Sequence, residues 1–362
     1  MTDSLRVGVI GLGYWGPNLV RVLTEMDGAD VVAVCDPRRE RLEMISRRFP
    51  AARSYEKPQE LLDDAIDAVV IATPISTHFE LGLAALEAGK HVLIEKPLAA
   101  SSIEAGSLIS RAGELGLVLM PGHTFLYSPP VVCIHDLIAA DELGDIYFIS
   151  TSRVNLGLHQ PDVSVVWDLA PHDFSILRYW LGETPKYVRA LGRGCVIPTI
   201  PDVAFISLEF DSGPIAHAEL SWLSPSKLRR TTIVGSRKMV VYDDTSNEPV
   251  RIFDAGVELP EPETFGQYKL TYRTGDVISP RVDVAEPLMV ELADFRAAIV
   301  DGRTSKSSAF LGLEVVKMIE AVDESLATFG ARVEVNGLPF SSRLDATAGS
   351  IQSRVDEREA AI

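Results

Sequence analysis

The residues best suited to chemistry in this chain are Lys96, Asp168 and His172. Lys96 follows the apolar run 91–95 and precedes Pro97, which biases the backbone of Lys96 toward an extended geometry. A cation fixed at the end of a strand can hold a substrate oxygen. The alternative interpretation is an ordinary solvated lysine at the start of a loop.

Asp168 and His172 are four residues apart, in the segment 167–173, where a helix is predicted to begin and to run to Leu181. This spacing places both side chains on one face of the helix, and Pro171 is expected in the first turn, where backbone N–H groups lack partners. Histidine has an ordinary pKa of about 6.5, which suits proton transfer near neutral pH. The alternative is that Asp168 caps the helix and His172 is a hydrogen-bonded structural residue.

The element expected to position a cofactor near these groups is a glycine turn. Gly11, Gly13 and Gly16 have the G-x-G-x-x-G spacing, between the strand-like run 5–10 and the helix-like run 18–26. In this arrangement the glycines permit a tight turn, close approach of a pyrophosphate and helix–strand packing, and the helix N-terminus faces the phosphates. The alternatives are a flavodoxin-like turn or glycines that occur there by chance.

Asp36 strengthens the dinucleotide interpretation. It ends the second predicted strand, 30–36, and lies 20 residues after Gly16, where a carboxylate can accept hydrogen bonds from ribose hydroxyls. A carboxylate there repels a 2′-phosphate, which favours NAD over NADP. Arg38 and Arg39 are the counter-argument, because arginine binds phosphates. We expect the carboxylate to dominate and the two arginines to turn toward solvent.

Residues 1–122 alternate strand-like and helix-like segments, which predicts an α/β domain with a Rossmann, doubly wound parallel sheet. Ligands of such sheets bind at the carboxyl ends of the strands. The expected cofactor contacts therefore include residues of the glycine turn and of later strand ends, namely Gly11, Gly13, Tyr14, Trp15, Gly16, Asp36, Thr73, Pro74, His78, Glu95 and Lys96. For His78, helix capping or packing is an equal alternative. For Tyr14 and Trp15, the alternative is that they fill the cleft between the domains.

The pattern changes at residue 123. Strand-like runs at 146–154, 187–192, 203–210, 215–222, 228–235 and 239–243, two of them with period-2 character at 205–209 and 216–222, predict a C-terminal α+β domain with a large, mostly antiparallel open sheet. Two late helices are predicted at 287–300 and 309–328. The expected division is an NAD-binding domain at 1–122, a substrate-binding and oligomerisation domain at 123–340 and a polar tail at 341–362.

Composition excludes several classes of function. Lys and Arg number 34 against 51 Asp and Glu, so the formal net charge of −17 argues against a phosphate-neutralising, nucleic-acid-binding surface. The three scattered cysteines, without a C-x-x-C or His/Cys cluster, indicate reduced thiols and no metal site. No apolar run is long enough for a bilayer span, and the N-terminus lacks a signal-peptide pattern. We expect a cytoplasmic protein with no membrane partner.

Four stretches together resemble the glucose–fructose oxidoreductase / inositol dehydrogenase (Gfo/Idh/MocA) family. They are residues 8–18, residues 72–78, residues 88–97 with the Glu-Lys-Pro segment, and Asp168-x-x-x-His172. The resemblance extends from about residue 5 to about residue 340. It implies a two-domain NAD(P)-dependent dehydrogenase, commonly a dimer or tetramer joined through the open sheet, with catalytic roles for Lys96, Asp168 and His172.

The expected function is hydride transfer between NAD and a hydroxyl or keto carbon of a sugar or sugar nucleotide. A cyclitol dehydrogenase of the inositol type and a non-catalytic nucleotide-binding regulator on the same fold are the alternatives. The expected substrate contacts are Lys96, His123, Asn155 and His172. Arg153, His159 and Gln160 are further candidates for the substrate pocket, and the alternative for them is a loop of polar residues without contact to substrate. The alternative for His123 is packing between the domains.

Overall fold

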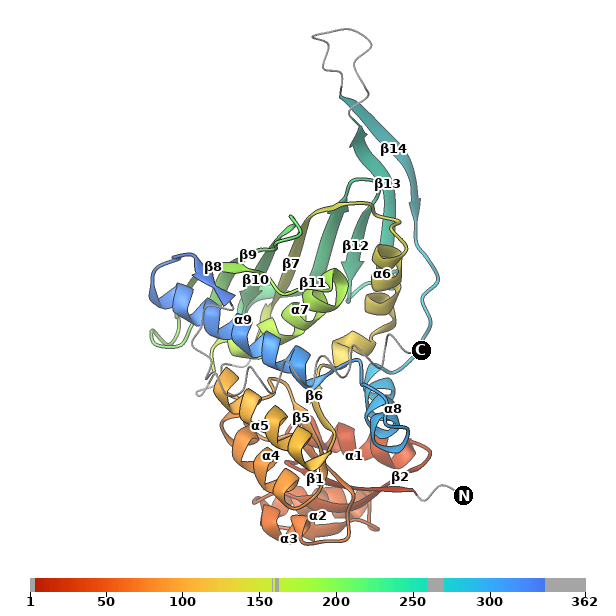
Figure 1. Ribbon diagram of the computed structural model, residues 1–362, viewed down its shortest axis with the longest axis vertical. Helices are drawn as coiled ribbons and strands as arrows, with labels where there is room; N and C mark the ends of the chain where they lie inside the picture. The colour runs from red at the N-terminus through yellow and green to blue at the C-terminus, as the bar shows by residue number, and fades with distance from the viewer. Residues whose placement is uncertain (1–3, 158, 160–162, 259–269, 336–362) are drawn as a thin grey trace. The chain divides into compact units, whose positions relative to one another are not determined.

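The computed structural model describes residues 4–157, 159, 163–258 and 270–335 (Figure 1). These residues form two compact units. Of the described residues, the first unit contains those up to Tyr127 together with Ala285–Lys317, and the second contains those of Ser128–Val284 together with residues 318–335. The expected single domain 123–340 is therefore wrong for residues 285–317, which return to the first unit. Gln160 and the tail 341–362 lie outside the described residues.

Polar side chains of α8 (Pro287–Val300) hold this helix in the first unit. The Arg296 Nε–H donates to the Gly28 carbonyl at 2.8 Å, and Asp294 accepts from the Tyr127 hydroxyl at 2.7 Å. Both contacts lie more than 160 residues apart in the chain, so no local sequence pattern signals them.

The first unit contains a six-stranded parallel sheet in the order β3-β2-β1-β4-β5-β6. Its strands are β1 (Leu5–Ile10), β2 (Ala29–Cys35), β3 (Arg53–Tyr55), β4 (Ala68–Ile71), β5 (His91–Glu95) and β6 (Leu119–Gly122). The predicted doubly wound parallel sheet is confirmed. The sequence analysis missed β3, which has only three residues and therefore too short a pattern to recognise.

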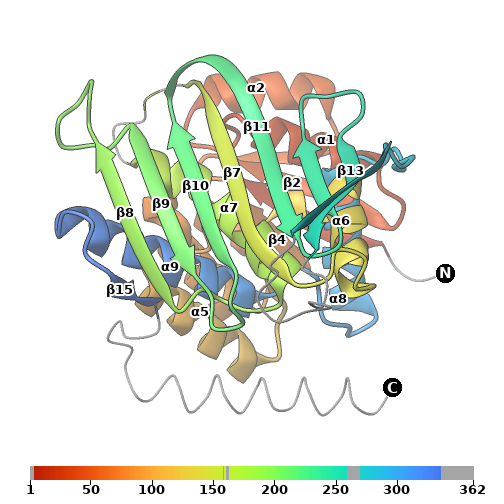
Figure 2. The same cartoon turned by 90° about the horizontal axis from the view of Figure 1, so that it is seen from above.

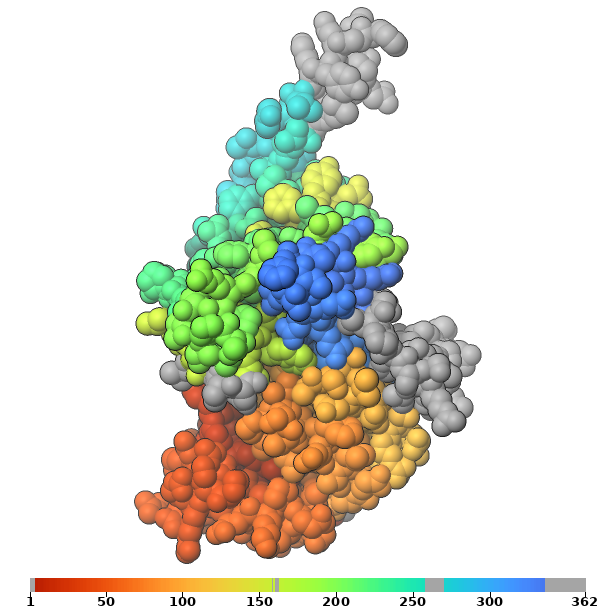
Figure 3. Space-filling view, turned by 90° about the vertical axis from the view of Figure 1, so that its left-hand side faces the viewer, coloured from red at the N-terminus to blue at the C-terminus, as the bar shows by residue number. Residues whose placement is uncertain are grey.

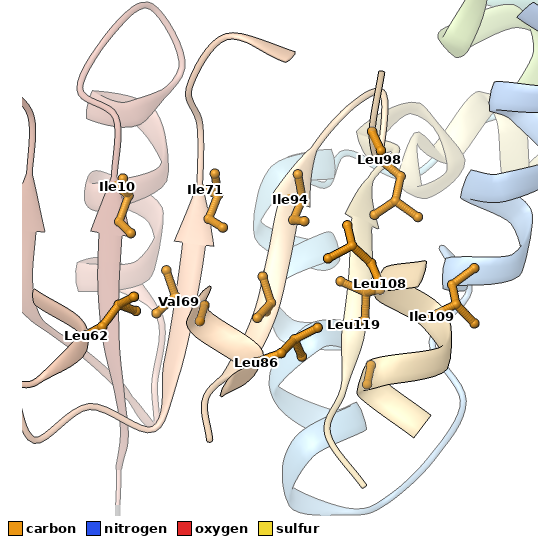
Figure 4. Packing of buried hydrophobic residues seen from close by; sticks show 14 of the residues in the cluster. Ile10, Leu62, Val69, Ile71, Leu86, Ile94, Leu98, Leu108, Ile109 and Leu119 are labelled. Atoms are coloured by element: carbon orange, nitrogen blue, oxygen red, sulfur yellow. The ribbon is translucent and has the colours of Figure 1, made fainter. Parts of the chain in front are cut away.

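Helices cover this sheet and exclude water from its strands. They are α1 (Gly16–Glu25), α2 (Arg39–Arg48), α3 (Pro58–Leu62), α4 (His78–Glu87) and α5 (Ser102–Leu115), with short 3₁₀ turns η1 (Ile75–Thr77) and η2 (Thr124–Tyr127). Figure 4 shows Ile10, Ile71 and Ile94 in a row on neighbouring strands, with Leu86 and Leu108 from α4 and α5 among the residues packed around them. Strands buried on both faces explain the continuous apolar runs of the sequence.

The second unit contains a nine-stranded sheet in the order β14-β13-β12-β11-β7-β10-β9-β8-β15. The strands are β7 (Ile146–Leu156), β8 (Tyr187–Arg193), β9 (Val203–Glu209), β10 (Ile215–Ser221), β11 (Leu223–Gly235), β12 (Met239–Asp243), β13 (Val250–Glu258), β14 (Thr271–Ile278) and β15 (Val333–Glu334). All neighbours pair antiparallel except β7 and β10, which are parallel. The predicted mostly antiparallel sheet is confirmed.

Helices α6 (Pro129–Ala139), α7 (Val165–Leu181) and the later part of α9 (Ala309–Ala327) belong to this unit. Figure 2 shows α7 on one face of the sheet, and Figure 3 shows the blue C-terminal segment beside the green residues around β8, with which β15 pairs. Along β9, Ala204, Ile206 and Leu208 are buried, whereas Phe205 between them is exposed. The sheet therefore has one covered and one open face among the described residues.

Helix α7 begins earlier than predicted. Its N-cap is Ser164, and the Asp168 backbone N–H already donates to the Ser164 carbonyl at 3.1 Å. The interpretation of Asp168 as the N-cap is therefore wrong, and Pro171 lies inside the helix rather than before its first hydrogen bonds. Asp168 and His172 still lie one helical turn apart.

None of the described helices combines the length and apolar character that a bilayer crossing requires. Among the same residues, no group of three or more His, Cys, Asp or Glu side chains is arranged to hold a metal ion.

Candidate active site in two halves

The glycine turn after β1 fits the pyrophosphate of a dinucleotide. Gly11 has φ of 94°, a conformation that L side chains rarely adopt. A Cβ on Gly16 would lie 2.1 Å from the Gly11 carbonyl oxygen, so only glycine lets α1 begin this close to the turn. A Cβ on Gly13 would meet nothing within 4 Å, which leaves that side of the turn open to a ligand. Each glycine thus has one of the roles that the motif requires.

Asp36 follows β2 and connects it to the same turn. Its Oδ2 accepts from the Leu12 backbone N–H at 2.8 Å and from Arg38 Nη2 at 2.9 Å, and its Oδ1 accepts from Arg38 Nε at 2.8 Å. Burial opposes ionisation of Asp36, but the hydrogen bonds from Arg38 and Leu12 outweigh it, so the pKa of Asp36 lies below its usual value. Asp36 is therefore a carboxylate at neutral pH.

The expectation that both arginines turn to solvent is wrong for Arg38, because Asp36 holds its guanidinium in a two-pronged ion pair. Arg39 does extend outward, with a side chain 80% exposed that pairs with Glu43 at 3.5 Å. A buried carboxylate attracts the nearest guanidinium strongly, which the sequence argument underestimated.

Tyr14 and Trp15 lie within the glycine turn. Tyr14 is 85% exposed, Trp15 is 42% exposed, and their rings pack edge to face with centroids 5.8 Å apart. Within the described residues these two side chains are available to a ligand on the first unit.

His78 joins two strand-end segments that were predicted to contact the cofactor. Its Nδ1 lies 2.8 Å from the Pro97 carbonyl and its Nε2 lies 2.9 Å from the Thr73 carbonyl. The ring is buried, and burial lowers the pKa of His78. Both nitrogens thus face the chain's own backbone, an arrangement that holds Thr73 and the residues after Lys96 in place and leaves no ring nitrogen for the cofactor.

Lys96 lies among buried titratable groups at the ends of β5 and β6. The Lys96 backbone N–H donates to Glu95 Oε2 at 3.3 Å, and burial raises the pKa of Glu95 to about 7 although the Lys96 charge acts to lower it. His123, which follows β6, is 1% exposed, and burial together with the charge of Lys96 lowers its pKa to about 3. Neither ring nitrogen of His123 has a hydrogen-bond partner among the described residues. His123 is thus a neutral imidazole able to bond with a ligand.

The second unit supplies Asp168 and His172 from α7. The Trp222 indole N–H donates to Asp168 Oδ2 at 3.1 Å, and the Trp222 ring packs edge to face against His159 at 5.3 Å. Asp173, next to His172, forms a buried ion pair with Arg153 of β7, with an Nη2–Oδ1 distance of 2.8 Å. This pair fixes the part of α7 that carries His172.

The residues of the second unit that were expected to contact substrate differ in their surroundings. Arg153 is 5% exposed and bonded to Asp173, so it supports α7 instead of presenting its guanidinium to a ligand. Asn155 is half-buried on β7, and His159 is directed to Asp202 at 3.5 Å. Sequence reasoning missed Asp173 and Trp222. The adjacency of Asp173 to His172 was the one available signal, whereas Trp222 is 54 residues from Asp168 in the chain.

Two protein-family models match this chain. A model described as an oxidoreductase family with an NAD-binding Rossmann fold matches residues 5–123, and a model of the GFO/IDH/MocA C-terminal domain matches residues 131–241. Together the two models match more than half of the chain.

Two of the relatives of this chain are dehydrogenases by name. The chain is 31% identical over 273 residues to scyllo-inositol 2-dehydrogenase (NAD(+)) of Bacillus subtilis, covering 70% of this chain and 78% of the relative. It is 29% identical to UDP-N-acetylglucosamine 3-dehydrogenase of Acidithiobacillus ferrooxidans, covering 67% and 75%. A solved structure of GenD2 from gentamicin A biosynthesis, in complex with NAD, superimposes with a TM-score of 0.78 at 26% identity, covering 92% and 97%.

We predict that the unmodified protein prefers NAD to NADP by at least about tenfold in kcat/KM, because the Asp36 carboxylate repels a 2′-phosphate. Replacing Asp36 with Ser should remove most of that preference. Asp30→Ser, an exposed position on the same strand, is the matched control and should leave it intact. Steady-state kinetics with both cofactors measures the ratio, and a preference of the unmodified protein for NADP would contradict the role given to Asp36.

Proposed function

This chain belongs to the Gfo/Idh/MocA family of NAD-dependent oxidoreductases that act on sugar-type substrates, and we propose that it oxidises or reduces one carbon of a sugar or sugar nucleotide. Two groups of residues carry the proposal; each is called a half-site and each lies within its own unit. The first unit has a glycine turn, Asp36 and Lys96 at its strand ends, and the second has Asp168 and His172 one turn apart on an anchored helix.

The groups of this chain have to move a proton as well as support hydride transfer. NAD supplies the hydride acceptor or donor when it is bound. An alcohol that loses hydride must also lose its O–H proton, and we assign that proton to His172, whose side chain is suited to general-base catalysis. Asp168, one turn earlier on α7, orients the imidazole and stabilises its charged form.

Lys96 is assigned to the reacting oxygen. An ammonium group there stabilises negative charge that develops on that oxygen. Two contacts hold the backbone around Lys96. Glu95 accepts from the Lys96 backbone N–H, and His78 contacts the Pro97 carbonyl. His123, with its two unpartnered ring nitrogens among the described residues, is assigned to the substrate or to the nicotinamide end of the cofactor.

A cyclitol is the second candidate substrate, favoured by the 31% identity to an inositol dehydrogenase. A sugar nucleotide is favoured by the identity to UDP-N-acetylglucosamine 3-dehydrogenase. We predict that, among sugars, nucleotide sugars and inositols tested with NAD, a sugar or nucleotide sugar has the highest kcat/KM by nicotinamide absorbance. An inositol with the highest value would overturn the substrate class, and no turnover of any compound would favour a nucleotide-binding regulator.

We predict that His172→Ala and Lys96→Ala each lose at least about 100-fold in kcat while they still bind NAD, because loss of a general base typically costs about 10²–10⁴ in rate. Asp168→Asn should lose less. His135→Ala and the exposed Lys57→Ala are matched controls outside both half-sites. Steady-state kinetics and NAD titration by protein fluorescence measure the two effects. A near-normal kcat for His172→Ala would place the base elsewhere, and loss of NAD binding would favour a structural role.

We also propose that the protein is a homodimer or homotetramer joined through the open face of the nine-stranded sheet. Register pairing aligns Leu191 with Phe205 and Ile215 with Phe148 on that face, and these side chains are 62%, 47%, 58% and 40% exposed. Apolar side chains gathered on an open sheet face favour burial against a second copy. The unpaired cysteines, Cys35, Cys133 and Cys195, support a reducing, cytoplasmic location.

Light scattering at micromolar concentration should give the mass of two or four chains. Phe205→Lys should lower that mass because it places a charge in the proposed contact, whereas Val284→Lys, which is fully exposed and outside the sheet strands, should not. A monomeric mass for the unmodified protein would contradict the proposal.

A further inference from the structure

Glu291 of α8 is a fully buried acid that the reaction described above does not use. Its Oε2 accepts a hydrogen bond from the Thr124 hydroxyl at 2.7 Å. Its Oε1 has no hydrogen-bond partner among the described residues. An isolated buried carboxylate is costly, and a buried carboxyl group with an unsatisfied oxygen calls for a specific explanation.

The charged groups around Glu291 come from several elements of the first unit. On its own helix, Asp294 is already bonded to the Tyr127 hydroxyl at 2.7 Å, the Lys306 backbone N–H at 2.8 Å and Arg303 at 3.1 Å. From β5, the charge of Glu95 acts on Glu291. Glu95 in turn is close to Lys96. Nothing in this group supplies Glu291 with a cation of its own.

His123 adds no positive charge to the groups around Glu291. It is buried beside the charge of Lys96, and that charge together with burial keeps its imidazole neutral near neutral pH. The cluster of Glu95, Lys96, His123 and Glu291 thus contains two buried carboxyl groups and a single cation. When two buried carboxyl groups interact in this way, one of them retains its proton.

Two observations decide which carboxyl group retains the proton. Burial, and then the charge of Glu95, raise the pKa of Glu291 well above its usual value. Glu95 is also buried, but the Lys96 charge and the Lys96 backbone N–H favour its ionised form, and its pKa is about 7. Burial and the single hydrogen bond from Thr124 therefore favour the neutral form of Glu291, whereas the Lys96 charge favours the carboxylate of Glu95.

We propose that Glu291 is a positioning residue of the Lys96 half-site: as a neutral acid of α8 it accepts the hydrogen bond from Thr124 of η2 and leaves Glu95 as the ionised member of the two interacting carboxyl groups. The proposal rests on the function assigned to Lys96 above. It gives α8, which enters the first unit from far along the chain, a part in setting the charge around Lys96. A second carboxylate in the cluster would add negative charge beside Glu95.

A purely structural role for Glu291 makes a different prediction. Anchoring η2 to α8 needs only an acceptor for the Thr124 hydroxyl, whereas the proposal also needs a proton on Glu291. The two roles separate in the infrared spectrum, because a protonated carboxylic acid has a C=O stretching band that a carboxylate lacks. At pH 8.5 Glu95 is mostly ionised, so a band from this cluster at that pH belongs to Glu291.

The experiment records infrared spectra of the full-length protein at pH 8.5. A buried-acid band should be present in the unmodified protein, absent in Glu291→Gln and retained in Glu95→Gln. Thr124→Val, which removes the hydrogen bond but not the acid, is the matched control and should shift the band without removing it. The same band in Glu291→Gln, or no band in the unmodified protein, would overturn the proposal.

Activity provides the second readout. Glu291→Leu removes both the acceptor and the neutral polar group and should lower kcat at least about tenfold, and Glu291→Gln should restore most of that loss because an amide is a neutral acceptor of the same size. A Glu291→Gln variant that folds but is as impaired as Glu291→Leu would show that Glu291 acts as a carboxylate, which contradicts the proposal. The infrared test needs no substrate, so it is decided even if no sugar is turned over and the proposed function fails.

Discussion

The arrangement of the first unit depends on a close approach of backbone segments at the end of β1. A Cβ on Gly11 would lie 2.4 Å from the Ala72 carbonyl oxygen, and one on Gly16 would lie 2.1 Å from the Gly11 carbonyl oxygen. No other residue type tolerates both contacts, because backbone atoms cannot move aside as a flexible side chain can. This constraint sets the start of α1 beside the end of β4, and it leaves the Leu12 backbone N–H where Asp36 can accept from it.

Charged groups in both units are then held by hydrogen-bonding partners, two of which are sequence neighbours. Asp36 holds Arg38, Glu95 accepts from the backbone of Lys96, and Asp173 holds Arg153 behind His172. Each such charge costs free energy to bury and is stable only with its partner, so the partner also fixes its position. The residues next to the side chains assigned to the chemistry are therefore held by these contacts without a ligand.

The sequence predicts most of this because its signals are local. The strands 5–10 and 91–95 are mostly apolar runs, and α8 was predicted with its observed bounds, Pro287–Val300. It does not predict β14, whose side chains are mostly exposed and lack alternation, or the start of α7, where Ser164 is followed by the β-branched Val165 and Val166 and makes no side-chain capping bond. The partners of the site were missed for another reason: Glu291 lies 167 residues from Thr124, and no pattern in one sequence relates such positions.

The central claim is that Lys96 and His172 support direct hydride transfer between a sugar carbon and NAD. The most direct test uses a sugar or nucleotide sugar carrying deuterium on the carbon that is oxidised, with mass spectrometry of the nicotinamide product. We predict that the reduced cofactor carries one deuterium from the substrate, and that formation of this product falls at least about 100-fold in His172→Ala and Lys96→Ala. Reduced cofactor without substrate deuterium, or formed at an unchanged rate in both variants, would contradict the account.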